Sequence, residues 1–184
     1  MCRALIASLG YLHRTMTGLA ALVVLVVTPA HAQQTSSACK LLQVAEIESA
    51  LGGKASTKPS GSVQSVPDMV LDECFVELPG QDGIRRVSIR IVTNLPIDGG
   101  EGIRARNAGT ARETQWKVAG ARLEEKTVGN AICILSGRPN VVGHTTCSIP
   151  RGKGYVEVDV TGSVHELASM DAVRALLQKA VTRL

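Results

Sequence analysis

The segment Tyr155-Val156-Glu157-Val158-Asp159-Val160 alternates valine with tyrosine, glutamate or aspartate at every position. In a β-strand, successive side chains point to opposite faces, so the three valines share one face and the two carboxylates share the other. Valine also favours strands, because its branched Cβ restricts the side chain. The segment therefore predicts a strand whose valine face is buried in the core of a sheet.

Residues 86–91 repeat this pattern, with valine and isoleucine on one predicted face and arginine and serine on the other. One face is expected to be buried and the other to face solvent. Further strands are expected at 69–78, 121–126, 130–136 and 142–149. Residues 54–67 contain Ser, Thr, Gly and Pro without periodicity and are expected to form a loop.

Helical spacing of apolar residues predicts helices at 41–51, 101–113 and 169–184. Strands grouped by turns, with helices before, between and after them, indicate an α+β fold. We expect an antiparallel sheet of about five or six strands packed with two or three helices, as a two-layer sandwich. The alternative is a small β-barrel with a C-terminal helix.

Residues 1–32 have the features of a signal peptide. Arg3 and Arg14 make its start positive, 19–27 is an unbroken apolar run, and Ala30-His31-Ala32 matches the small-x-small pattern that precedes cleavage. The apolar core is shorter than the roughly 20 residues that cross a bilayer, so a retained membrane anchor is the less favoured alternative. We expect a single domain at 33–184, periplasmic or secreted, with no stable membrane insertion after cleavage.

Charge and aromatic content narrow the classes of partner. Without the two arginines of the predicted signal peptide, the net charge falls from +4 to +2. A protein that binds nucleic acid through its phosphates needs a stronger basic excess, so nucleic acid is not expected as a partner. The aromatic residues of 33–184 are Phe75, Trp116 and Tyr155. They offer few platforms for stacking against sugars or bases.

The predicted mature domain contains Cys39, Cys74, Cys133 and Cys147. An even number of cysteines in an exported chain favours two disulfides, for which three pairings are possible. Cys133 and Cys147 are equally far from Asn140, which lies in a turn-like segment, so a hairpin would place them opposite each other. We therefore expect Cys133–Cys147 and Cys39–Cys74. The alternative is a free catalytic or metal-binding cysteine.

Several of these features occur together in a known pattern: a Cys-x-Leu-Leu start, a Glu-Ile helix that ends in Leu-Gly, a cysteine in the first strand and a C-terminal helix. The matching residues are Cys39, Leu41, Leu42, Glu46, Ile47, Leu51, Gly52, Cys74 and 172–184. The pattern resembles a family of small exported domains of unknown function, common as lipoproteins in actinobacteria. The resemblance implies a two-layer sandwich like that of the PsbP proteins, which are mainly binding or assembly factors. This chain lacks the lipidated first cysteine and has the additional Cys133/Cys147 pair, so the resemblance supplies no membrane anchor and no catalytic residues.

Two groupings suggest chemistry. Glu157 and Asp159 share a strand face, and their Cα atoms are expected about 7 Å apart at roughly 3.3–3.4 Å per residue. Two carboxylates at this distance could act as acid and base in glycoside cleavage. Exposure to solvent, or pairing with an arginine of the next strand, is the more ordinary explanation. His144 and Cys147 could form a catalytic dyad only if they faced each other, whereas residues three apart on a strand point to opposite faces.

Arginines are the candidate ligand-binding residues. Arg86 and Arg90 share one strand face, and Arg104 and Arg112 recur two turns apart on the predicted middle helix. Guanidinium groups bind carboxylate or phosphate through paired hydrogen bonds, so a converged cluster would bind an anionic ligand or an acidic partner. The alternative is ordinary surface charge, paired with nearby glutamates.

Walker, Rossmann, Gly-x-Ser-x-Gly and His-Glu-x-x-His motifs are absent from the sequence, so we expect no cofactor and no metal. The sequence favours a non-enzymatic periplasmic or secreted binding or assembly domain that recognises a protein partner or an anionic envelope component. A small periplasmic hydrolase that uses Glu157 and Asp159 is the alternative. A structural or inhibitory protein that docks the loop 54–67 is a third possibility.

Overall fold

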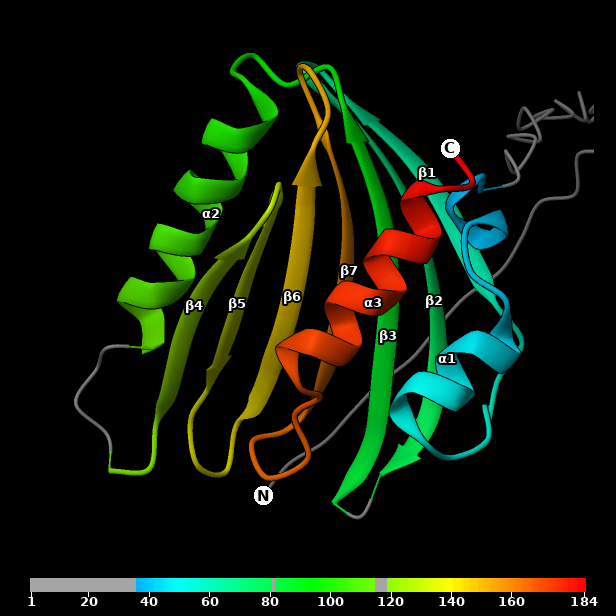
Figure 1. Cartoon of the computed structure of the whole chain (residues 1–184), viewed down its shortest axis with the longest axis vertical. Helices are drawn as coiled ribbons and strands as arrows, with labels where there is room; N and C mark the ends of the chain where they lie inside the picture. The colour runs from blue at the N-terminus through cyan, green and yellow to red at the C-terminus, as the bar shows by residue number, and fades with distance from the viewer. Residues whose placement is uncertain (1–35, 81, 115–118) are drawn as a thin grey trace, which may run out of the picture. The chain divides into compact units, whose positions relative to one another are not determined.

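The computed structural model describes residues 36–80, 82–114 and 119–184, so the predicted signal peptide and Trp116 lie outside the described residues. The described chain forms one open antiparallel sheet of seven strands, with three α-helices and a short 3₁₀ helix, Ala38–Lys40 (Figure 1). The strands are β1 (Ser60–Val66), β2 (Met69–Gly80), β3 (Gly83–Thr93), β4 (Arg122–Val128), β5 (Ala131–Gly137), β6 (Val142–Pro150) and β7 (Tyr155–Ser163). The helices are α1 (Val44–Leu51), α2 (Gly99–Thr114) and α3 (Met170–Val181).

The alternating segment 155–160 lies in β7, which is the central strand of the sheet. The strand order is β1-β2-β3-β7-β6-β5-β4, and each neighbouring pair is antiparallel. The predicted antiparallel α+β class is therefore confirmed. Because the sheet is open, β1 and β4 form its two edges, and the β-barrel alternative is wrong.

β1 is the strand that sequence reasoning missed, since 54–67 was expected to form a loop. Its sequence, Ser-Gly-Ser-Val-Gln-Ser-Val, has no strong alternation and no aromatic residue. Its pairing with β2, from Ser60 opposite Phe75 to Val66 opposite Met69, holds it in the extended conformation. Tertiary pairing overrides weak strand propensity here, and it is one reason why the sheet has more strands than predicted.

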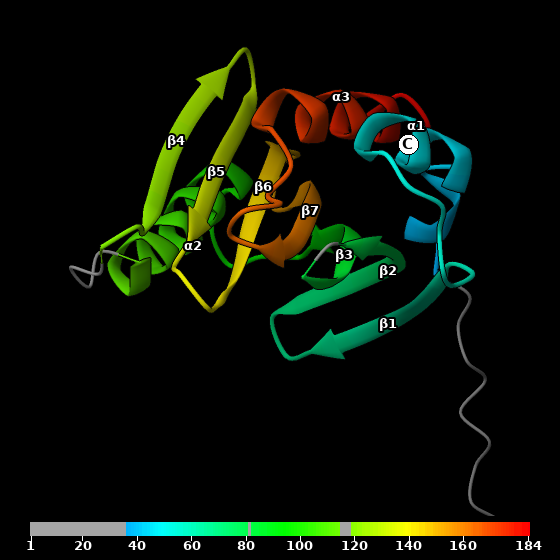
Figure 2. The same ribbon diagram turned by 90° about the horizontal axis from the view of Figure 1, so that it is seen from below.

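The helices cover both faces of the sheet, with α1 and α3 on one face and α2 on the other (Figure 2). On β6, Thr145 and Ser148 point to opposite faces. The Thr145 hydroxyl donates to the carbonyl of Ala168, just before α3, and the Ser148 hydroxyl accepts from Arg106 of α2. The α3 side holds the main core, which contains the three valines of β7. The predicted apolar stripe of α3 is confirmed by its buried residues, Val173, Leu176, Leu177 and Ala180.

The start of α2 is fixed against the turn between β6 and β7. The Gly99 amide donates to the carbonyl of Gly152 at 2.8 Å. A Cβ at Gly99 would collide with the carbonyl of Gly154, so only glycine permits this close approach. The Asp98 carboxylate then accepts from the Gly100 amide at 2.8 Å and caps the first turn. This junction sets the position of α2 over the second face of the sheet.

Both predicted disulfides are present. Cys133 and Cys147 lie opposite each other on β5 and β6 and are bonded, as the hairpin centred on Asn140 predicts. Cys39 in the 3₁₀ helix is bonded to Cys74 in β2, which ties the start of the described chain to the sheet. The four cysteines of the described residues are therefore all used in disulfides, and the alternative of a free catalytic or metal-binding cysteine among them is wrong.

We expect the two disulfides to contribute unequally to stability. They close loops with sequence separations of 35 for Cys39–Cys74 and 14 for Cys133–Cys147. In the chain-entropy relation, replacing each pair by alanine lowers the free energy of unfolding by about 4 and about 3 kcal/mol respectively. Urea denaturation of the two double variants would measure this difference. A larger loss for Cys133→Ala with Cys147→Ala would contradict the expected order.

Candidate functional site

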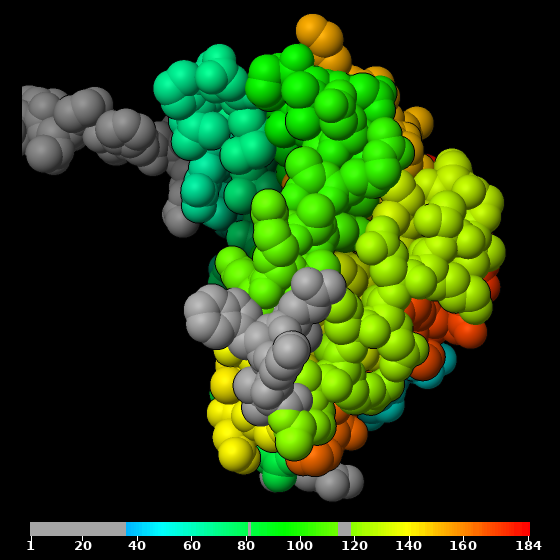
Figure 3. All heavy atoms as spheres, turned by 90° about the vertical axis from the view of Figure 1, so that its left-hand side faces the viewer, coloured from blue at the N-terminus to red at the C-terminus, as the bar shows by residue number. Residues whose placement is uncertain are grey.

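The polar face of β2, β3, β7 and β6 contains a hollow of about 480 Å³. It lies on the sheet face that α2 covers only in part; Figure 3 shows this side of the molecule, where α2 and β4 lie at the surface. Its lining combines acids, bases, hydroxyls and three apolar side chains: Glu73, Phe75, Glu77, Ile84, Arg86, Ser88, Arg90, Val142, His144, Asp159 and Thr161. Side chains of opposite charge thus meet beside exposed apolar groups.

Beneath this hollow, Glu157 is held by two arginines. This residue belongs to β7 and is 2% exposed, and its carboxylate accepts from the Arg90 Nη1 of β3 at 3.0 Å. Arg106 of α2 forms a second ion pair with Glu157, and the Ser148 hydroxyl donates to the same carboxylate at 3.0 Å. A carboxylate removed from water needs such partners, because an unpaired buried charge is strongly unfavourable. The pairing therefore couples α2 to the centre of the sheet.

Arg90 and Arg106 have further contacts that fix their orientation. The Arg90 Nε donates to Glu73 at 2.6 Å, so this side chain bridges β2 and β7. The Arg106 guanidinium lies over the Tyr155 ring, 5.5 Å from its centroid, in a cation–π arrangement. Burial lowers the pKa of Arg106, against the opposing effect of Tyr155. Both arginines are thus ordered before any ligand is bound.

Asp159, also on β7, forms a second buried cluster. It is 3% exposed and accepts from the hydroxyls of Thr146 at 2.6 Å and Thr161 at 2.9 Å. Its Oδ2 lies 3.4 Å from the Nδ1 of His144. Burial alone would raise the pKa of Asp159, but the hydrogen bonds from His144 and Thr146 and the nearby positive charges outweigh it, so this pKa is lowered. Asp159 therefore stays ionised.

His144 stands at the rim of the hollow with 48% of its side chain exposed. The hydrogen bond to Asp159 is the main reason that its pKa is raised, and burial opposes this effect. Because Nδ1 faces Asp159, a proton on that nitrogen leaves Nε2 for contacts outside the cluster. His144 can thus present a positive charge to a ligand under mildly acidic conditions.

Arg86 is the most accessible arginine of the hollow, with 54% of its side chain exposed. Its Nη2 donates to Glu77 at 2.9 Å, and its guanidinium lies 5.2 Å from the centroid of the Phe75 ring. These two contacts hold the side chain over the polar face. They use only one N–H group of the guanidinium, which has five. Arg86 is therefore suited to bind an external carboxylate or phosphate.

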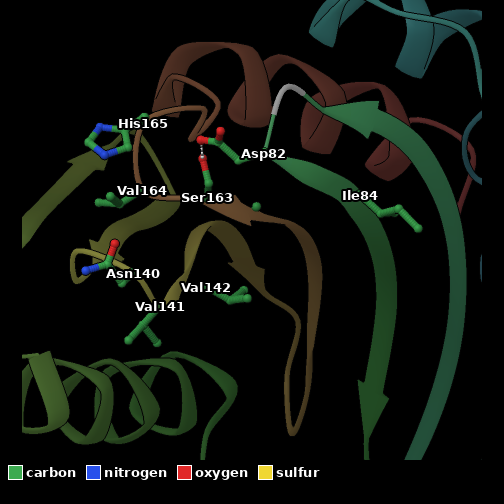
Figure 4. A pocket seen from close by; sticks show the side chains of 9 residues that line it. Asp82, Ile84, Asn140, Val141, Val142, Ser163, Val164 and His165 are labelled. Carbon is green, nitrogen blue, oxygen red and sulfur yellow. Dashed lines mark hydrogen bonds between the residues drawn. The ribbon is translucent and has the colours of Figure 1, made fainter.

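A second hollow, of about 570 Å³, adjoins the first at the ends of β3, β6 and β7 (Figure 4). The two hollows share Ile84 and Val142, and Val141 extends the exposed apolar surface. On its far side, the Ser163 hydroxyl donates to Asp82 at 3.0 Å, and His165 lies beyond them. The joined hollows form one concave surface with a charged end and an apolar middle.

The structure brings together two of the four predicted arginines. Arg86 and Arg90 line the hollow, whereas Arg104 and Arg112 are exposed on α2. Arg106, which sequence reasoning did not single out, is the arginine of α2 that reaches the sheet. A signal for it exists, because residues three and four positions after the buried Ile103 share its helix face.

Glu157 and Asp159 lie on one face of β7 as expected, and both are buried there, so exposure to solvent does not account for them. The more ordinary explanation for Glu157, pairing with an arginine of the next strand, is confirmed by Arg90 of β3. His144 and Cys147 point to opposite faces as expected, since His144 meets Asp159 while Cys147 is bonded to Cys133. Both carboxylates are surrounded by donors, which does not favour an acid–base pair.

Among residues 36–80, 82–114 and 119–184, no group of three or more His, Cys, Asp or Glu side chains could hold a metal ion. In the same part of the chain, none of the helices is long and apolar enough to span a membrane.

Comparisons with known proteins give structural similarity but no related sequence. No family model matches the chain, and no curated protein matches it. Among solved structures, the chain is similar to the extracellular domain of PknH from Mycobacterium tuberculosis, with a TM-score of 0.49 and 14% sequence identity, covering 83% of this chain and 95% of that one. We draw no argument about function from a similarity of this size, and the resemblance to small actinobacterial exported domains stays a prediction.

We expect Arg106→Met to destabilise the protein by about 3 kcal/mol, because it removes one partner of a buried carboxylate. The matched control, Arg104→Met on the exposed side of the same helix, should change the free energy of unfolding by less than about 0.5 kcal/mol. Adding Glu157→Gln to Arg106→Met should recover part of the loss, since the uncompensated charge is then removed. Urea denaturation measures all three. Equal effects of the two arginine variants would contradict this account of Glu157.

We expect the His144 pKa, measured by NMR titration, to lie above 6.5 and to fall in Asp159→Asn. A raised pKa means that the folded state holds the proton more tightly than the unfolded state. The stabilisation is therefore fully present below the unfolded pKa and is lost as the pH rises through the folded pKa. His144→Gln should accordingly cost more stability in mildly acidic than in mildly alkaline solution. A pKa at or below 6.5 would disprove the pairing with Asp159.

Proposed function

We propose that the described domain is a non-enzymatic extracytoplasmic binding domain, and that its joined hollows bind an extended acidic segment of a partner protein. The observation that carries the proposal is the pair of exposed apolar residues, Ile84 and Val142, which line both the charged hollow and the hollow beside it. Ile84 is 64% exposed although it belongs to a strand. Exposed apolar side chains grouped beside charged ones are typical of interaction sites.

An extracytoplasmic location is supported by the two disulfides. Disulfides persist in oxidising compartments and are rare in the cytosol, where thiols are kept reduced. The predicted signal peptide is consistent with the same location. The domain would therefore meet its partner outside the cytoplasm.

The charged end of the concave surface is suited to carboxylates. Arg86 contributes N–H groups that Glu77 does not use, and His144 contributes Nε2, whereas Arg90 is held in place by Glu73 and Glu157. Charge-assisted hydrogen bonds to a carboxylate are among the stronger polar contacts. An acidic side chain of the ligand would bind here, and neighbouring apolar side chains would cover Ile84 and Val142.

An anionic envelope component is the competing ligand, and it would depend on fewer residues of the site. A polyanion without apolar groups would depend on Arg86 and His144 but not on Ile84. No contact of Glu157 or Asp159 favours the hydrolase alternative, because both carboxylates are buried and already accept hydrogen bonds. We therefore propose the acidic protein segment.

The test is selection of random eight-residue segments displayed on phage against the protein. Segments rich in Asp or Glu together with Leu, Ile or Val should be enriched. Their affinity should fall at least about tenfold in Arg86→Ala, as expected for the loss of a charge-assisted hydrogen bond, and should also fall in Ile84→Ser. Arg122→Ala on β4 is the matched control, because Arg122 pairs with a glutamate on the same strand and lies away from the hollows.

Two results would count against this function. The first is enrichment of segments that bind equally well to Arg86→Ala and Ile84→Ser. The second is binding of a polyanion such as heparin that depends on Arg86 but is unchanged in Ile84→Ser, which would favour the envelope component instead. Enriched segments should also bind more tightly as the pH falls, because His144 gains its proton.

A further inference from the structure

The two edges of the open sheet differ in charge. β4 carries four charged side chains, Arg122, Glu124, Glu125 and Lys126. β1 carries none, and its residues are Ser, Gly, Val and Gln. Natural sheets protect an exposed edge with charge, because its unpaired N–H and C=O groups can pair with another strand. β4 is protected in this way and β1 is not.

In the described part of the chain, β1 pairs with β2 on one side and with no strand on the other. Its residues are exposed or half-buried along its whole length. Pro59 and Pro67 flank it directly, and proline has no N–H to extend a ladder beyond these points. The unprotected edge is therefore one short strand with defined ends.

The sequence around β1 is complementary to itself in the antiparallel direction. A two-fold axis at Val63 would pair β1 with a second copy as follows: Ser60 with Val66, Gly61 with Ser65, and Ser62 with Gln64. Just beyond the ends of the paired strands, Lys58 of one copy, before Pro59, and Asp68 of the other, in the turn between β1 and β2, would lie at the same end. Lys58 and Asp68 are both exposed. Neither forms an ion pair with any other described residue.

We propose that β1 is a dimerisation strand, and that two copies of this chain pair antiparallel through β1 with Lys58 of each beside Asp68 of the other. The symmetric arrangement forms two such ion pairs, one at each end of the strand. Opposite charges across paired strands are favourable and like charges are not. The occupant of the edge is thus a second copy, because its own sequence supplies the complementary charge.

The charged edge β4 explains why the association stops at two copies. Pairing of β1 with β4 of another molecule would be heterologous and would leave free edges for further addition. The charges on β4 disfavour such pairing. Pairing of β1 with β1 uses both unprotected edges and closes the assembly. A single pair of seven-residue strands buries less surface than a stable dimer interface, so the dimer should be weak and concentration-dependent.

Cysteine cross-linking tests the proposed register between the two β1 strands. The experiment uses the protein as it is isolated after expression. The variants Ser62→Cys and Gln64→Cys, when mixed and mildly oxidised, should form a disulfide-linked heterodimer, because directly opposed residues are close enough to bridge. The control mixture is Ser60→Cys with Gln64→Cys, in which the two cysteines are displaced along the strand. We expect the first mixture to yield at least about five times more cross-linked heterodimer.

Charge reversal tests the end contacts by sedimentation velocity over a range of concentrations. Lys58→Glu alone should raise the dissociation constant of the dimer at least about fivefold, because it places like charges at both ends. Adding Asp68→Lys should restore dimerisation, since the ion pairs are then re-formed with exchanged signs. Lys126→Glu on β4 is the matched control and should have no effect.

The outcomes are decisive in either direction. Preferential cross-linking of Ser62→Cys with Gln64→Cys and rescue by the double charge reversal would establish the dimer. A monomer at all concentrations, equal cross-linking in the control mixture, or cross-linking of Gln64→Cys to a Glu124→Cys variant of β4 would overturn the proposal. The positions lie on exposed or half-buried polar sites, and retention of the two native disulfides, checked by peptide mapping, shows that each variant has folded.

Discussion

Glu157 is a carboxylate buried at the centre of the sheet, and Arg90 and Arg106 compensate its charge from two different elements. Burying an ionised group without partners is strongly unfavourable, so β3, β7 and α2 have to be positioned together. On the other side of the sheet, the valine face of β7 has to be shielded from water, and α3 covers it. One central strand is therefore buried on both faces, by apolar packing on one and by ion pairs on the other.

This arrangement determines what the candidate site offers a ligand. Arg90, Asp159 and Glu157 form a floor whose hydrogen bonds are satisfied within the protein. Arg86 and His144 stand above this floor and remain accessible, with Ile84 beside them. Because the floor is already ordered, binding would not need to organise it, which lowers the entropic cost of recognition. The same ordering argues for recognition rather than for acid–base chemistry by the two buried carboxylates.

Sequence patterns predicted the elements that have their own strong signal. Alternating valines gave β7, the apolar stripe gave α3, and the symmetry about Asn140 gave the Cys133–Cys147 pair. Sequence patterns did not predict features that depend on contact with another element of the fold. β1 is extended because β2 pairs with it, and Arg106 reaches Glu157 because α2 is docked by Gly99 on the turn between β6 and β7. Spacing along the chain places Arg106 on the same helix face as Ile103, but it does not identify the partner of Arg106 or the strand that pairs with β1.

The sequence by itself determined the α+β class, the two disulfides and the faces on which Arg86, Arg90, Glu157 and Asp159 lie, because side-chain alternation in a strand is a local property of the backbone. The tertiary structure decided whether each polar face is exposed. The face of β7 with Glu157 and Asp159 is buried, since α2 and the long arginine side chains cover it. It also left β1 as an uncharged edge, because the order of strands in a sheet depends on contacts between distant segments.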